Sequence, residues 1–165
     1  MTIASSIDSL TAVHRLFREK YIPEIEQHFL SLHDEVSFHT TFLQLSYHQF
    51  IQVKNELFSH FEEEEQFIFP LLVEYENGNL IEFSDNVDRF LNEHHVAEGE
   101  VQVILQLLQC QIDQLGEFLP YRMLIHKLNA LQQLISLHSE QEDMVFQKVT
   151  RNFSRNERLF KLNNN

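Results

Sequence analysis

The sequence contains few of the residues that break helices or cross-link chains. Its 165 residues include three Gly, three Pro, one Cys and no Trp. Because Cys110 is the single cysteine, an internal disulfide and a zinc site built on thiolates are excluded. The scarcity of turn-forming residues indicates long helices joined by short connections. The length fits one domain with a hydrophobic core of its own.

Basic residues and long apolar runs are also scarce. Twelve Lys and Arg stand against 25 Asp and Glu, which gives a formal net charge of −13. This balance argues against a nucleic-acid partner, because such a partner requires a basic surface. No apolar run approaches the roughly 20 residues of a membrane span, so no membrane partner is expected. The first residues lack the pattern of a signal peptide, and we expect a cytoplasmic location.

The spacing of apolar residues predicts an all-α, up-down-up-down four-helix bundle. We expect Ser5 or Ser6 to cap the first helix, and Pro23 to kink it or to mark a boundary near Ile22. Pro70 should kink or end the second helix. The bundle is expected over residues 1–150 and a polar C-terminal tail over residues 151–165. The four helices are expected at about residues 6–32, 40–72, 85–115 and 120–149.

The predicted core positions repeat every three or four residues along each helix. In the first helix they include Leu10, Phe17, Tyr21, Ile25 and Leu32. In the second helix they are Phe42, Val53, Leu57, Phe67 and Leu71. The fourth helix has the most regular pattern, with Leu124, Leu128, Leu131, Ile135, Val145 and Val149.

One histidine interrupts the apolar stripe of each helix, and in two helices a glutamate follows it by four residues. Residues four apart lie one turn apart on the same side of a helix. A carboxylate on a buried face is costly unless it is paired or coordinates a metal ion. The six residues are His14, His60, Glu64, His94, His138 and Glu142.

The four histidines are expected to lie in one layer of the bundle. In an antiparallel hairpin, residues equally distant from the turn lie at the same height. His14 and His60 each lie about 20 residues from the first connection, and His94 and His138 each lie about 20 residues from the third. Imidazole and carboxylate ligands without thiolate suit iron, manganese or zinc. Two carboxylates between histidines can bridge two metal ions, and a metal-free polar network is the alternative reading.

Neighbours of these residues leave alternatives open. His94 continues the stripe of its helix, but His95 beside it could ligate instead. Glu98, four residues after His94, is either a ligand or a charge at the edge of the stripe. The remaining acidic residues after His60 are expected on a solvated face, where one of them could orient a ligand imidazole; they are Glu62, Glu63 and Glu65.

The run His60-Phe61-x-x-Glu64-Glu65-x-x-Ile68-Phe69-Pro70 resembles the hallmark helix of the hemerythrin-like, cation-binding domains. His14, the pair Glu93-His94 and the pair His138-x-x-x-Glu142 fit the same ordered pattern, which covers about residues 7–149. The resemblance implies a four-helix bundle that holds two iron ions with oxo or hydroxo and carboxylate bridges. It implies four terminal ligands, His14, His60, His94 and His138, and two bridging ligands, Glu64 and Glu142.

The sequence departs from the oxygen-carrying hemerythrins in the third helix. Those proteins have a second histidine one turn further along, where this chain has Glu98 after His94 and Gly99 after His95. One missing imidazole would leave a coordination position open to O₂, NO or peroxide. The ligand set is closer to the repair-of-iron-centres proteins, but the sequence lacks the cysteine pair that those proteins usually carry.

These features predict a metal-binding protein that binds or senses O₂, NO or iron, as a monomer or a homodimer, and we expect binding rather than catalysis. The missing cysteine pair and the small size favour this reading, whereas the missing fifth histidine favours turnover. Two alternatives therefore stay open. One is an iron–sulfur repair factor or an enzyme that reduces NO or peroxide, and the other is a structural bundle with adventitious metal.

Overall fold

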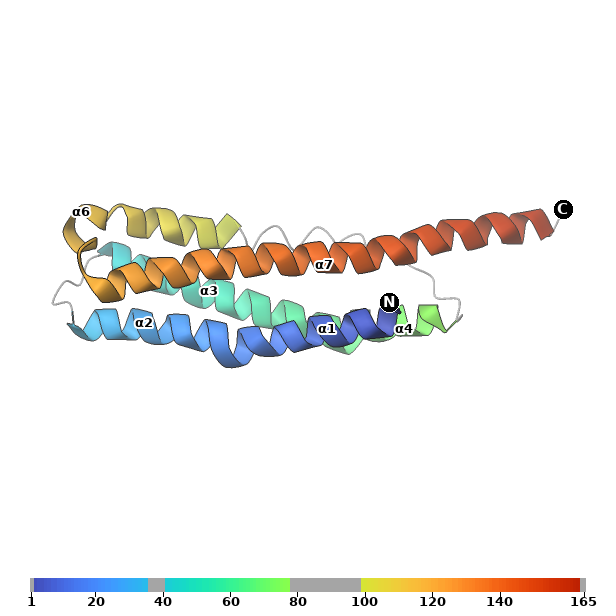
Figure 1. The fold of residues 1–165 in the computed structure, drawn as a ribbon, viewed down its shortest axis with the longest axis horizontal. Helices are drawn as coiled ribbons and strands as arrows, with labels where there is room; N and C mark the ends of the chain where they lie inside the picture. The colour runs from blue at the N-terminus through green and yellow to red at the C-terminus, as the bar shows by residue number, and fades with distance from the viewer. Residues whose placement is uncertain (1, 36–40, 78–98, 164–165) are drawn as a thin grey trace.

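The computed structural model of the protein describes residues 2–35, 41–77 and 99–163. These segments form long antiparallel helices that pack side by side as a four-helix bundle (Figure 1). The predicted all-α four-helix bundle is therefore confirmed. The start of the third helix, together with His94, His95 and Glu98, lies outside the described residues.

The first long helix consists of α1 (Ile3–Leu16), the π-helical turn η1 (Phe17–Tyr21) and α2 (Ile22–Glu35). The backbone of Thr2 is extended, and its side-chain oxygen accepts a hydrogen bond from the backbone N–H of Ser5 at 3.1 Å. Thr2 is therefore the N-cap. The prediction that Ser5 or Ser6 caps this helix is wrong, because the helix begins a few residues earlier.

The second long helix consists of α3 (Thr41–Glu63), η2 (Glu64–Ile68) and α4 (Phe69–Glu76). Residues 99–109 are the described part of the third helix, and a short helix, α6 (Ile112–Leu115), follows it. The fourth helix, α7 (Leu119–Asn163), begins within one residue of its predicted start and has Pro120 in its first turn. It continues beyond Val149 and projects past the rest of the bundle (Figure 1).

Each of the first two helices contains one π-helical turn just before a proline. In η1 the N–H of Ile22 donates to the carbonyl of Phe17, five residues back, and Pro23 follows. The turn η2 repeats this arrangement before Phe69 and Pro70. A proline ring inside an α-helix clashes with the carbonyl four residues earlier, and in both helices that carbonyl belongs to the wider π turn. The prolines therefore mark transitions through which the helix continues.

The extra residue in a π turn changes which side chains face the core. Regular helical spacing after Glu64 predicts Phe67 and Leu71 inside, but they are 61% and 39% exposed. Ile68 and Leu72 are buried in their place. The predicted stripe is therefore wrong by one residue after Glu64. In η2 the Phe69 N–H donates to the carbonyl five residues earlier, whereas in a regular α-helix it would donate to the carbonyl four residues earlier.

The same shift occurs in the first helix, where Ile22 is buried and Tyr21 is only half-buried. Phe42, which was also predicted inside, is exposed, and the next residue, Leu43, is buried. In α7, where no π turn intervenes, all six predicted apolar positions are buried. Regular spacing therefore predicts the core of α7 fully, whereas it fails at or just after each π turn and at Phe42, the second residue of α3.

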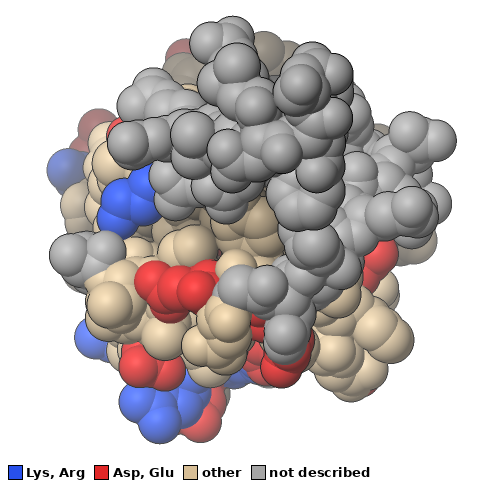
Figure 2. All heavy atoms as spheres, turned by 90° about the vertical axis from the view of Figure 1, so that its right-hand side faces the viewer, with Lys and Arg blue, Asp and Glu red and all other residues tan. Residues whose placement is uncertain are grey.

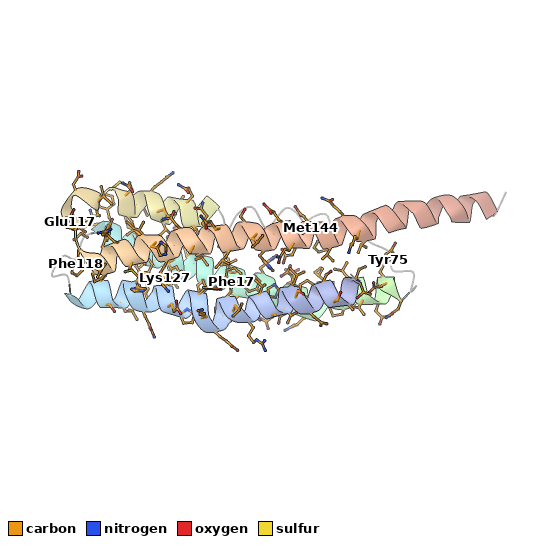
Figure 3. The ribbon with its side chains drawn as sticks, in the orientation of Figure 1. Phe17, Tyr75, Glu117, Phe118, Lys127 and Met144 are labelled. Carbon is orange, nitrogen blue, oxygen red and sulfur yellow. The ribbon has the colours of Figure 1, made fainter. Side chains whose placement is uncertain are left out.

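Charged side chains of both signs lie on the described surface (Figure 2). Seen from the end of the bundle in Figure 2, acidic side chains lie in groups with fewer basic ones beside them. Some basic residues pair with acidic ones across helices. Lys127 of α7, labelled in Figure 3, forms an ion pair with Glu24 of α2, and Lys54 Nζ of α3 lies 2.7 Å from Glu26 Oε2 of α2. Within residues 2–35, 41–77 and 99–163, no helix has the length and apolar character needed to cross a membrane.

Candidate metal centre

His14 lies in α1, shortly before the η1 turn, and its side chain is fully buried. Its ring stacks on Phe61 with the ring centres 4.1 Å apart and the planes 13° apart. It also stacks on Phe69, at 5.7 Å and 16°. The η2 turn brings Phe69 to the buried side of its helix. Two aromatic rings therefore restrict the orientation of the His14 imidazole in a dry environment.

Three further polar side chains meet His14 in the centre of the bundle. One ligand atom each from His14, Glu64, His138 and Glu142 lies within 4.8 Å of all the others. His14 Nε2 lies 3.1 Å from Glu64 Oε2 and 3.1 Å from His138 Nε2, and His138 Nε2 lies 2.6 Å from Glu142 Oε1. Both carboxylates are fully buried. We call these four residues the buried His/Glu cluster.

The buried His/Glu cluster separates two apolar parts of the core. The larger part occupies the half of the bundle that contains α2 and α6, and the smaller part lies where α1 starts and α4 ends. Phe17, which belongs to the larger part, lies about midway along the first helix in Figure 3. The bordering residues are Phe17, Phe61 and Ile135 on one side and Leu10, Ile68 and Val145 on the other.

The carboxylates strongly affect the protonation of His14. Burial by itself lowers the pKa of His14, since it disfavours the imidazolium. The nearby carboxylates of Glu142, Glu64 and Glu65 oppose this effect, because they favour the imidazolium, and they raise the pKa to about 9. A proton on His14 therefore offsets part of the negative charge buried in the cluster. A metal cation bound to the same atoms would offset that charge more completely.

The model of the hemerythrin HHE cation-binding domain matches residues 5–150 of the chain. The chain belongs to this hemerythrin family. All four residues of the buried His/Glu cluster lie inside the matched region. Among curated proteins and solved structures, the chain has no match.

The buried His/Glu cluster has the chemistry that a cation-binding hemerythrin domain requires. Burying two carboxylates without compensating charge is costly, and a coordinated cation removes that cost. Imidazole nitrogen and carboxylate oxygen suit iron, manganese and zinc alike. The four atoms converge from α1, η2 and α7, so one ion could contact three separate parts of the chain. The cluster therefore fits a metal site, and its ligand types leave the identity of the metal open.

The structure brings together four of the six residues that the sequence singled out. A fifth, His60, lies beside them: its Nε2 is 3.5 Å from Glu64 Oε1, and its side chain is 15% exposed. His60 therefore lies at the edge of the buried His/Glu cluster, between the Glu64 carboxylate and the surface. The sixth residue, His94, and the alternatives His95 and Glu98 lie outside the described residues.

One contact to the cluster was only partly visible in the sequence. Glu65 Oε1 lies 2.8 Å from His14 Nδ1 and 2.8 Å from an Arg18 guanidinium nitrogen. Glu65, which was expected on a solvated face, therefore touches a cluster imidazole. Arg18 follows His14 by four residues, and this spacing was the available signal. Arg18 was not predicted, because nothing in the pattern of the first helix connects it to the second helix.

Proposed function

We propose that this hemerythrin-family chain is a non-haem di-iron protein that binds or senses O₂, NO or iron. The proposed ligands are His14, His60, Glu64, His94, His138 and Glu142. The observation that carries the proposal is the meeting of two fully buried carboxylates with two buried imidazoles at atom separations within 4.8 Å. A desolvated set of this kind needs a cation for charge balance, and the bridging of two metal ions by carboxylates is familiar in helical bundles.

The side chains around the cluster support binding of a small ligand in a dry interior. Iron held there would supply a centre able to bind a diatomic molecule and to change oxidation state. Glu64 and Glu142 would hold the cations, and His14 and His138 would present Nε2 toward them. Phe61 lies against both imidazoles, stacked on His14 and edge-on to His138 with its centre 5.5 Å away. The Phe61 and Phe69 rings exclude water from the imidazoles, and the lower dielectric constant strengthens electrostatic interactions within the site.

Metal analysis of matched variants tests this proposal. We expect protein purified from iron-replete cells to contain about two iron ions per chain, with oxo-bridge absorption bands. His138→Ala and Glu142→Ala should lose most of the metal, because each removes a proposed ligand. The controls are His126→Ala and Glu140→Ala, which change exposed residues of the same helix, α7. Both controls should retain the full metal content.

Two outcomes would contradict the proposal. The first is a wild-type protein that contains no metal and takes up none when Fe²⁺ is added anaerobically. The second is a Glu142→Ala variant with the metal content and spectrum of the wild type, which would show that the buried His/Glu cluster is not the site. Full metal content as zinc or manganese would instead retain the site and overturn the assignment of iron.

Rapid mixing of the reduced protein with O₂ or NO distinguishes reversible binding from catalytic turnover. A carrier or sensor should form one stable adduct whose amount equals the number of sites. An enzyme that reduces NO or peroxide, the alternative, should consume an excess of the gas or peroxide in the presence of a reductant. The hypothesis of carriage and sensing fails if consumption exceeds one equivalent per site and continues.

A further inference from the structure

Glu65 connects the buried His/Glu cluster to the protein surface. It lies in η2, directly after Glu64, and its side chain is 29% exposed. Its Oε1 lies 2.8 Å from His14 Nδ1 and 2.8 Å from Arg18 Nη1. The outer side of Glu65 and Arg18 faces a surface hollow of about 420 Å³ next to α1. The three residues therefore form a hydrogen-bonded chain that leads from the hollow to the buried imidazole.

The two ring nitrogens of His14 have different surroundings. Nδ1 faces the Glu65 carboxylate, whereas Nε2 faces Glu64, His138 and Glu142 at 3.1, 3.1 and 3.9 Å. A metal-binding imidazole uses one nitrogen for the metal and donates the N–H of the other to an acceptor. This second bond selects the tautomer and the ring orientation. Glu65 has the position required for that acceptor.

Arg18 restricts the position of Glu65. Its guanidinium donates to the same oxygen that accepts from His14, and its central carbon lies 5.6 Å from the centre of the Phe61 ring. Phe61 in turn stacks on His14. The His14 imidazole is therefore held from two directions. Glu65, fixed by Arg18, accepts its Nδ1–H, and Phe61 packs on its ring face. Phe61 alone could not choose between the two ring nitrogens, because a stack does not distinguish them.

We propose that Glu65, held in place by Arg18, is a positioning residue that keeps the Nδ1–H of His14 hydrogen-bonded and so presents Nε2 to the metal. This inference rests on the proposed metal site and adds two residues to it, neither of which contacts the metal. Glu62, in the same acidic run, has a different environment: it is exposed and accepts a hydrogen bond from Gln66 at 2.9 Å. Glu62 therefore provides the matched control.

The affinity for Zn²⁺, measured by competition with a chelator, tests the inference. We expect Glu65→Ala to bind Zn²⁺ about 10- to 100-fold more weakly than wild type, the range typical for removing a partner of a ligand histidine. Glu62→Ala removes the same charge from the same helix and should bind within twofold of wild type. Arg18→Ala should weaken binding by less than Glu65→Ala, and Arg15→Ala, three residues earlier in the first long helix, should have no effect.

A second measurement separates positioning from a general structural role. Nitrogen-15 spectra of the Zn²⁺-bound protein should show a slowly exchanging Nδ1–H on His14 in wild type and in Glu62→Ala. Glu65→Ala should lose this protection, and Glu65→Gln, which keeps a side-chain oxygen as acceptor, should restore it. Circular dichroism should show equal helix content in all variants, because Glu65 is partly exposed and opens onto the hollow.

The outcomes distinguish this inference from the proposed function. Equal Zn²⁺ affinity and equal Nδ1–H protection in Glu65→Ala and Glu62→Ala would overturn the role of Glu65 while leaving the metal site standing. Equal loss of affinity in both variants would show an effect of charge alone and would also overturn it. A wild-type protein that takes up no Zn²⁺ would remove the metal site itself, and the inference with it.

Discussion

Single residues around η2 decide which side of the helix is buried. Phe69 is 3% exposed and stacks on His14, whereas Phe67, two residues earlier, is 61% exposed. Because both residues are phenylalanine, any difference between their contributions to stability must come from their positions. Their different burial follows from the five-residue hydrogen bond between Phe69 and Glu64. The pair therefore offers a direct test of the π turn.

We expect Phe69→Ala to lower the free energy of unfolding of the metal-free protein by about 3–5 kcal/mol, because it leaves a cavity beside His14. Phe67→Ala should change it by no more than about 0.5 kcal/mol, as is usual at exposed positions. Urea denaturation followed by circular dichroism measures both values. A larger loss for Phe67→Ala than for Phe69→Ala would show that the helix keeps regular spacing through residues 64–68.

At the scale of helices, the C-terminal end of α4 holds the N-terminal end of α1. The Glu76 carboxylate accepts hydrogen bonds from the backbone N–H groups of Ile3 and Ala4, at 2.8 and 3.1 Å. The first N–H groups of a helix have no partner within the helix and carry partial positive charge. These two bonds lower the pKa of Glu76 from its usual value. Glu76 thus joins two helix ends that are more than 70 residues apart in the chain.

Because its folded-state pKa is lowered, Glu76 should stabilise the protein only where it is ionised. The stabilisation is present above the ordinary pKa of a glutamate, about 4.3, and is lost as the pH falls through the lower folded-state pKa. We expect Glu76→Gln to lower the urea midpoint at pH 7 and to match wild type below this range. Glu140→Gln, which changes an exposed residue of α7, serves as the control. A difference in urea midpoint between Glu76→Gln and wild type that stays constant with pH would contradict this assignment.

Helix number and the regular stripes could be predicted from the sequence, because long helices with one apolar face leave a strong periodic pattern. In α7 the predicted positions from Leu124 to Val149 are all buried. Counting residues from the connections also placed His14, Glu64, His138 and Glu142 in one region, where the structure brings them together. The position of a residue along the helix axis depends on its distance in sequence from the connection. The prediction therefore holds even where a π turn rotates the side chains about that axis.

The details that the sequence did not reveal depend on contacts between helices or on local irregularity. Phe67 and Leu71 were placed inside because periodicity assumes four-residue hydrogen bonds throughout. Pro23 and Pro70 signalled that something changes near them, but a proline is compatible with a kink, an end or a π turn. The Arg18–Glu65 pair joins residues 47 positions apart, and no periodic pattern reports such a pair.

At the scale of the whole molecule, metal binding should be coupled to folding. The chain carries a formal net charge of −13, and two of its carboxylates are fully buried in the His/Glu cluster. Self-repulsion of this kind destabilises the compact state. A cation that binds only the folded chain stabilises it by mass action, by about 2.7 kcal/mol at a free concentration one hundred times Kd.

We therefore expect removal of metal by a chelator to lower the melting temperature of the wild-type protein, and re-addition of Fe²⁺ or Zn²⁺ to restore it. Glu142→Ala should show no such response, whereas Glu140→Ala should respond as wild type does. Differential scanning calorimetry with and without metal measures the shift. An equal shift in wild type and Glu142→Ala would mean that the cation acts at the acidic surface rather than in the core.

The length of α7 has a consequence for how the protein moves in solution. With 45 residues at 1.5 Å each, α7 is about 67 Å long. A compact chain of 165 residues has a radius of gyration of about 15 Å, which corresponds to a sphere roughly 40 Å across. The molecule is therefore longer than such a sphere by more than half. It should tumble as a rod, turning quickly about the bundle axis and slowly end over end.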